Sequence, residues 1–62
     1  MKGMVNMMKE LEKIRGLQIT YSFTYIVVKG NNWAVKMVLR EYGYQEGYDY
    51  DEITDNEIAI FL

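Results

Sequence analysis

The carboxylates between residues 49 and 57 are the side chains with the clearest potential for chemistry. This stretch contains five acids: Asp49, Asp51, Glu52, Asp55 and Glu57. A calcium-binding EF-hand loop needs oxygen ligands at positions 1, 3 and 5 and glycine at position 6. Counted from Asp49, position 5 is Ile53 and position 6 is Thr54. The pattern therefore does not fit a calcium loop, and we expect a solvated acidic surface and no metal site.

The chain lacks most of the residue types that nucleophilic catalysis uses. Cysteine and histidine are absent, and the single serine is Ser22. Activated nucleophiles need a neighbouring base, which is most often histidine. Paired carboxylates can hydrolyse glycosides, but a chain of 62 residues cannot build a substrate cleft as well as its own core. The glycines form no phosphate-binding motif. We therefore expect a protein that is not an enzyme and that binds no cofactor.

Charge and tyrosine are unevenly distributed along the chain. All seven basic residues lie in residues 1–40, whereas residues 41–62 contain seven acids and no base. Four of the six tyrosines also lie in residues 41–62. Tyrosine is enriched at interfaces, and carboxylates between tyrosines speed the capture of a basic partner. We predict that this chain binds a protein partner with a basic surface. It would act as an inhibitor or as a mimic of nucleic acid. The predicted contact residues are Tyr44, Glu46, Tyr48, Asp49, Tyr50, Asp51 and Glu52.

Three alternatives explain the same asymmetry. The acidic and basic parts could simply pair within the chain, as charged surfaces often do. The chain could be a purely structural, self-assembling subunit. It could also bind nucleic acid, although a net charge of −2 and a pI of about 4.9 oppose this. The residues predicted for nucleic-acid binding are Lys29, Lys36, Arg40 and Tyr42.

The size of the chain predicts one small domain, residues 1–62, that needs additional stabilisation. Chains this short usually depend on disulfides, metals or oligomerisation. Without cysteine or histidine, oligomerisation remains, and we expect a homodimer. Residues 17–28 are too few and too polar to span a membrane, and the N-terminus does not resemble a signal peptide. We therefore expect a cytoplasmic protein without membrane contact. In composition alone, the chain resembles accessory proteins of phages and other mobile elements.

The first helix and the first strand are predicted directly by periodicity. Apolar residues spaced three and four apart predict a helix over residues 4–15, ended by Gly16. Alternation predicts a strand over residues 18–28, and a turn is expected at residues 43–47. Residues 48–53 and 57–62 are predicted as two further strands around Asp55 and Asn56, because the apolar ending is too short for a stable helix. These elements together predict an α+β fold, in which an amphipathic helix packs on a small antiparallel sheet.

Residues 33–42 fit either a strand or a helix. Asn32 and Gly43 would cap a helix, but seven of its ten residues are apolar, and such a helix needs extensive covering. As a strand, the segment pairs with residues 18–28 through a loop at residues 30–32, which brings Val27 opposite Val35. We prefer the strand, so the predicted order is one helix followed by four strands, with a second helix as the alternative.

Overall fold

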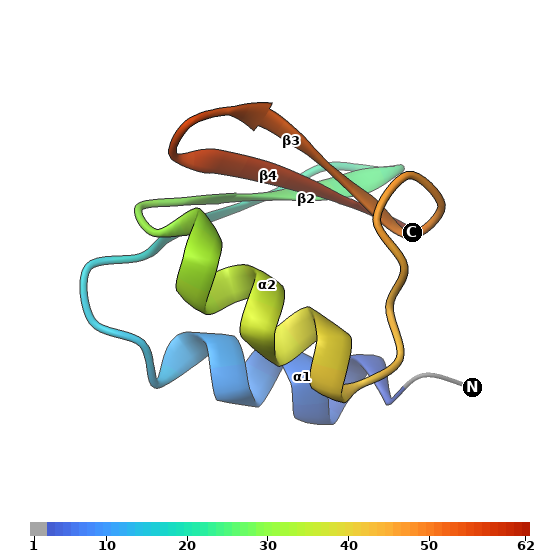
Figure 1. Ribbon diagram of the computed structural model, residues 1–62, viewed down its shortest axis with the longest axis horizontal. Coiled ribbons are helices and arrows are strands. Elements are labelled where there is room, and N and C mark those ends of the chain that lie inside the picture. Colours follow the sequence, from blue (N-terminus) through green and yellow to red (C-terminus); the bar gives the residue numbers. More distant parts are fainter. Residues whose placement is uncertain (1–2) are drawn as a thin grey trace.

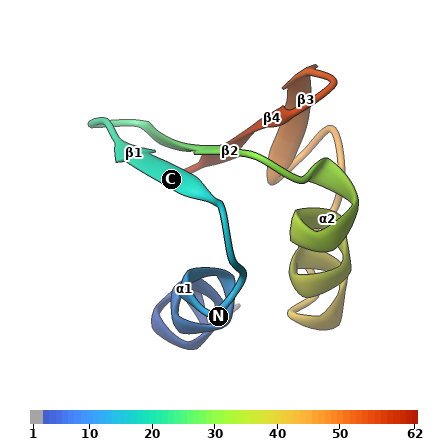
Figure 2. The same cartoon turned by 90° about the vertical axis from the view of Figure 1, so that its left-hand side faces the viewer.

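The computed structural model describes residues 3–62 and has two helices and two hairpins. The elements are α1 (Met4–Glu12), β1 (Gln18–Tyr21), β2 (Tyr25–Lys29), α2 (Asn32–Glu41), β3 (Tyr50–Thr54) and β4 (Glu57–Phe61). Both helices lie on one side of the sheet (Figures 1 and 2), and no other element of residues 3–62 covers its opposite side. The predicted α+β class, with an N-terminal helix on an antiparallel sheet, is confirmed.

The two hairpins form one open sheet, with the strand order β1-β2-β4-β3. The central pair is antiparallel and places Ile26 opposite Ile60 and Val28 opposite Ile58. These four side chains are buried because they face the helices, whereas the alternate residues of each strand point to the other side. The fully buried core also draws on both helices and on β3, through Met7, Leu11, Val35, Leu39 and Tyr50.

Helix α1 follows the predicted apolar stripe. Met7, Met8 and Leu11 are buried against the sheet and α2, as the spacing of three and four residues requires. The helix is shorter than predicted, since it ends at Glu12 and is followed by Lys13 as its C-cap. Ile14 continues the stripe beyond the helix and packs on the core while remaining partly exposed.

The preferred strand over residues 33–42 is wrong, because the segment forms α2. The Asn31 side chain accepts a hydrogen bond from the Ala34 amide, which caps the first turn. At the other end, the amides of Gly43 and Tyr44 donate to the carbonyls of Arg40 and Leu39. This is the Schellman arrangement, and Gly43 adopts its positive φ of 80°.

The helix forms because its apolar residues do not all need covering. Val35 and Leu39, four residues apart, face the core and are fully buried. Trp33 and Met37 instead face solvent, with exposed fractions of 74% and 43%. The predicted pairing of Val27 with Val35 is therefore absent, and Val27 lies opposite Ala59 of β4.

Residues 18–28 are also not one continuous strand. The chain turns at residues 22–24, where the Ser22 amide donates to the Tyr25 carbonyl over 2.9 Å, and β1 pairs with β2. The predicted strands near the C-terminus are confirmed as β3 and β4, whose register shifts between Glu52 and Thr54.

Candidate protein-binding surface

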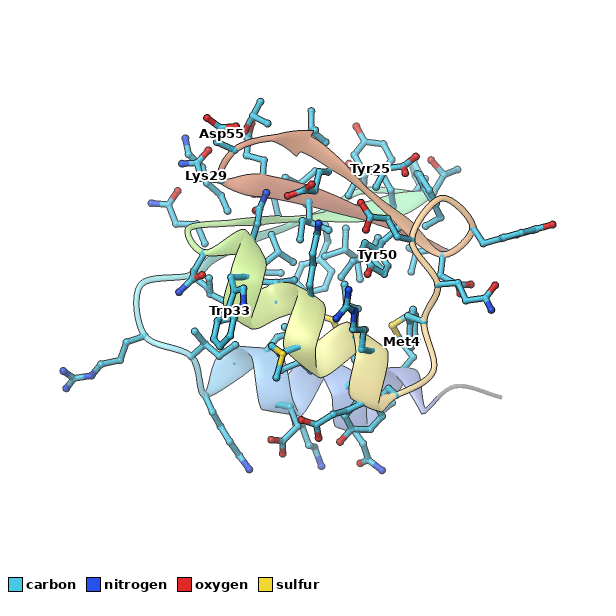
Figure 3. The ribbon with its side chains drawn as sticks, viewed as in Figure 1. Met4, Tyr25, Lys29, Trp33, Tyr50 and Asp55 are labelled. Atoms are coloured by element: carbon cyan, nitrogen blue, oxygen red, sulfur yellow. The ribbon has the colours of Figure 1, made fainter. Side chains whose placement is uncertain are left out.

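The acidic, tyrosine-rich segment is divided by the fold into buried anchors and an exposed loop. Tyr44 and Tyr50 are buried, with exposed fractions of 6% and 1%. Figure 3 shows Tyr50 between the sheet and α2. Tyr44 Oη also lies 3.7 Å from the Met4 sulfur of α1. Two of the predicted contact residues therefore belong to the core and fix the ends of the loop between them.

Residues 45–49 form this exposed loop, which we call the Tyr48 loop. The amides of Tyr48 and Asp49 donate to the Gln45 carbonyl over 3.1 and 2.7 Å. The Asp49 carboxylate accepts from the Gln45 amide over 2.7 Å, which closes the loop from the other direction. The Gly47 amide donates to the Tyr50 carbonyl. The loop is thus held by its own backbone rather than left free to adapt.

The Tyr48 loop is also attached to the end of the sheet. The Phe61 amide of β4 donates to the Asp49 carbonyl over 2.8 Å, and the Leu62 amide donates to the Thr24 carbonyl over 2.9 Å. These bonds bring together the loop, the end of β4 and the turn between β1 and β2. Each of the three segments has one large exposed side chain. Tyr48 of the loop is 81% exposed, Leu62 at the end of β4 is 61% exposed, and Phe23 of the turn is 103% exposed.

The remaining acids of the segment differ in how they are engaged. Glu52 Oε1 lies 2.9 Å from Lys36 Nζ, and Glu46 Oε1 lies 3.5 Å from the same nitrogen. Asn32 Nδ2 donates to Glu52 Oε2 over 3.0 Å. Asp51 lies on the opposite face of β3 and is exposed. Lys36 therefore uses part of the acidic charge within the chain, while Asp51 remains available at the surface.

These contacts shift the ionisation of the groups involved. The hydrogen bond from Lys36 lowers the pKa of the Glu52 carboxyl, and the bond from Asn32 adds to the effect. The same ion pair raises the pKa of the Lys36 ammonium. Burial raises the pKa of the Tyr50 phenol, and the negative charge of Glu46 acts in the same direction. Both members of the ion pair are thus held in their charged forms.

The residues predicted for nucleic-acid binding do not form one surface. Lys29 alternates with the buried residues of β2 and lies on the outer side of the sheet. Lys36 projects from α2 toward Glu46 and Glu52, and Arg40 is exposed in the last turn of that helix. Tyr42 is half-buried and packs on the core. Lys36 and Arg40 thus lie one turn apart on α2, whereas Lys29 lies on the other side of the sheet and Tyr42 packs on the core.

Several exposed aromatic residues were missed from the sequence. Trp33 projects from the solvent side of α2, and Tyr25 from the side of the sheet that faces away from the helices (Figure 3). Phe61 lies directly opposite Tyr25 in the register. A turn assigned at residues 22–24 would have placed Tyr25 on the side away from the core, because it reverses which residues of 25–28 face the core. The pairing of Tyr25 with Phe61 depends on the contact between β2 and β4, which are far apart in the sequence.

Neither a metal site nor a relative identifies the protein. Within residues 3–62, no three carboxylate, histidine or cysteine side chains come close enough together to hold a metal ion. In the same part of the chain, neither helix has the length and apolar character needed to cross a membrane. Comparison with protein-family models, curated proteins and solved structures gives no significant match. The surface itself is therefore the basis for a functional proposal.

Proposed function

We propose that this protein is a non-enzymatic protein-binding module, and that Tyr48 and the acids beside it contact a basic surface of the partner. The observation that carries the proposal is the 81% exposure of Tyr48 on a loop closed by hydrogen bonds and flanked by two buried tyrosines. Nothing in the core requires a tyrosine at this position.

The rigidity of the Tyr48 loop favours binding. A flexible loop loses conformational freedom on association, at a cost of about 0.5–1.5 kcal/mol for each side chain that is ordered. The Gln45 and Asp49 backbone bonds already fix this loop in the free protein. Tyrosine is also among the residue types that most often dominate binding energy when they fill a pocket. Tyr48 is therefore suited to serve as the anchor of an interface.

Electrostatics favours a basic partner. Asp51 is exposed beside the loop, and Glu46 keeps 46% of its side-chain exposure while it pairs with Lys36. Negative groups around an aromatic anchor attract lysine and arginine and raise the rate of association. An acidic module of this kind inhibits by occupying a basic groove that otherwise holds a nucleic-acid backbone.

The proposal is tested by affinity capture from host cells with the tagged wild-type chain and three variants. We expect one protein to be retained by the wild type and to lose at least tenfold in retention with Tyr48→Ala and with Asp51→Lys. Trp33→Ala is the matched control, because it removes a similarly exposed aromatic residue from α2, and it should retain the partner. Retention should also fall as salt increases.

The captured protein is then purified and titrated against the same four chains. Equal affinity for the wild type and Tyr48→Ala would contradict the proposal, as would loss of binding with Trp33→Ala alone. Binding of labelled DNA or RNA at low salt, with a steep dependence on salt concentration, would favour the nucleic-acid alternative instead.

A further inference from the structure

The side of the sheet that faces away from the helices, which we call the outer face, has an ordered pattern of side chains. The strand register places ten residues on it: Gln18, Thr20, Tyr25, Val27, Lys29, Asp51, Thr54, Glu57, Ala59 and Phe61. Ala59 lies between larger neighbours and is only 8% exposed. Tyr25 and Phe61 keep 40% and 41% of their exposure. No helix or strand of residues 3–62 covers this face (Figure 2).

The strand register arranges these residues in three rows across the sheet. In the first row, Lys29 of β2 lies opposite Glu57 of β4. In the second, Val27 lies opposite Ala59, with Thr20 of β1 and Asp51 of β3 at the two ends. In the third, Tyr25 lies opposite Phe61. Across the line between β2 and β4, the first row therefore pairs opposite charges, the second two aliphatic residues and the third two aromatic residues.

We propose that the outer face binds a second copy of this chain, around a twofold axis that runs parallel to the strands between β2 and β4. Such an axis keeps each row in place and exchanges its two halves. Lys29 then meets Glu57 of the second copy, and Val27 meets its Ala59. Thr20 meets the second copy's Asp51, and its hydroxyl can donate to that carboxylate.

The alternative axis, perpendicular to the strands, does not give this match. It would place the first row over the third, so that Lys29 and Glu57 would be covered by Tyr25 and Phe61 of the second copy. Covering charged groups with apolar side chains and no partner is costly. The axis parallel to the strands instead gives every charged residue of the first row an opposite charge.

Packing and area are consistent with this arrangement. Face-to-face sheets lie about 10 Å apart and interdigitate, and the small Ala59 leaves room for Val27 of the second copy. The apolar residues occupy the middle and one end, whereas charged and hydroxyl residues form the border, as in known interfaces. A standard interface buries about 800 Å² per partner, about a fifth of the 4376 Å² exposed by the chain. One complete side of a two-layer protein can supply such an area.

Charge reversal with complementary variants tests the interface, and no other protein is needed. In sedimentation equilibrium, the wild type should form a species of twice its 7.4 kDa mass at micromolar concentrations. Lys29→Glu places glutamate opposite Glu57 of the second copy, and Glu57→Lys places lysine opposite Lys29. Each variant alone should be monomeric under the same conditions. An equimolar mixture should restore the dimer, because each Lys29→Glu chain then faces opposite charges on a Glu57→Lys chain.

The mixing step separates the interface from effects within one chain. Lys29 and Glu57 are also neighbours in the same sheet, but no change inside one chain explains recovery on mixing. Lys9→Glu and Glu41→Lys on the exposed helix surfaces are the matched controls and should leave the dimer unchanged. A monomeric wild type, dimeric single variants, or a mixture that stays monomeric would overturn the proposal.

A second measurement on the wild type does not depend on the folding of any variant. In a mixed sample of isotope-labelled and unlabelled chains, nuclear Overhauser contacts between Val27 methyls of one copy and Ala59 of the other are expected. A dimer without contacts between these residues would overturn the proposed axis. Asp51 takes part in both proposals, whereas Tyr48 belongs only to the proposed function. Tyr48→Ala should therefore leave the dimer unchanged, and failure of one proposal can be told from failure of the other.

Discussion

Lys36 Nζ lies 2.9 Å from Glu52 Oε1, so one ion pair connects α2 to the edge strand β3. The second oxygen of the same carboxylate accepts a hydrogen bond from Asn32, one turn earlier on the helix. Glu52 is thus held from two positions along α2. Residues of the basic and acidic parts of the sequence meet here, and part of the charge asymmetry is satisfied within the chain.

Because of the Lys36–Glu52 ion pair, we expect the folded protein to lose stability in acid. The folded pKa of Glu52 is lowered from its ordinary value of 4.5 by the Lys36 hydrogen bond and then by Asn32. Its contribution is therefore present above pH 4.5 and is lost as pH falls through the lower, folded pKa. In urea unfolding across acidic pH, wild type should exceed Glu52→Gln in stability near neutrality and converge with it in acid.

A double-mutant cycle assigns that difference to the ion pair. In a Lys36→Met background, Glu52→Gln should remove much less of the pH dependence, because the largest cause of the pKa shift is already gone. If the two backgrounds gave the same pH profile, the shift would have to come from another neighbour.

The two kinds of tyrosine should respond differently to truncation. Tyr50→Ala removes a ring that is only 1% exposed and should destabilise the chain by about 3–5 kcal/mol. Tyr48→Ala removes a ring from the surface and should change the unfolding free energy by no more than about 0.5 kcal/mol. Urea unfolding measures both. A large cost for Tyr48→Ala would mean that this ring supports the fold and is not reserved for a partner.

The sequence predicts some elements and conceals others for physical reasons. Helix α1 is clear because its buried residues recur at one spacing, whereas α2 is masked by exposed apolar residues such as Trp33. The turn at residues 22–24 is masked because residues 25–28 are apolar on both faces and the turn contains neither glycine nor asparagine. The burial of Tyr50 follows from its pairing with Ile60, which depends on strands that meet in space. The burial of Tyr44 depends likewise on the core around it, which includes Met4 of α1.

Asn32 should tolerate loss of its side chain better than a negative charge. Its amide is buried and donates to the Thr54 carbonyl over 2.8 Å as well as to Glu52. Asn32→Ala removes the donor to the Thr54 carbonyl and to Glu52 but also removes the buried Oδ1, which has no hydrogen-bond partner among the described residues. The expected cost is about 1 kcal/mol, at the lower end for such losses. Asn32→Asp should cost more, because it places a carboxylate beside Glu52.

The neighbouring Asn31 provides the matched comparison. Its exposed side chain accepts a hydrogen bond from the Ala34 amide, and aspartate caps helices equally well. Asn31→Asp should therefore keep the stability of the wild type in urea unfolding, whereas Asn31→Ala should lose about 1 kcal/mol. Equal effects of aspartate at positions 31 and 32 would show that the amide of Asn32 is not needed as a donor.

Gly30 is the position where the backbone leaves least room for a side chain. Its φ of 140° is rarely adopted by other residues, and an added Cβ would lie 2.8 Å from the Gly16 carbonyl oxygen. Gly30→Ala therefore combines backbone strain with a clash against main chain, and should cost at least about 2 kcal/mol. At Gly43, φ is also positive but no atom lies within 4 Å of an added Cβ, so Gly43→Ala should cost only about 1 kcal/mol. Urea unfolding of both variants compares strain with and without the clash. Equal losses would show that the loop containing Gly16 moves aside, and that its contact with the end of β2 does not constrain the fold.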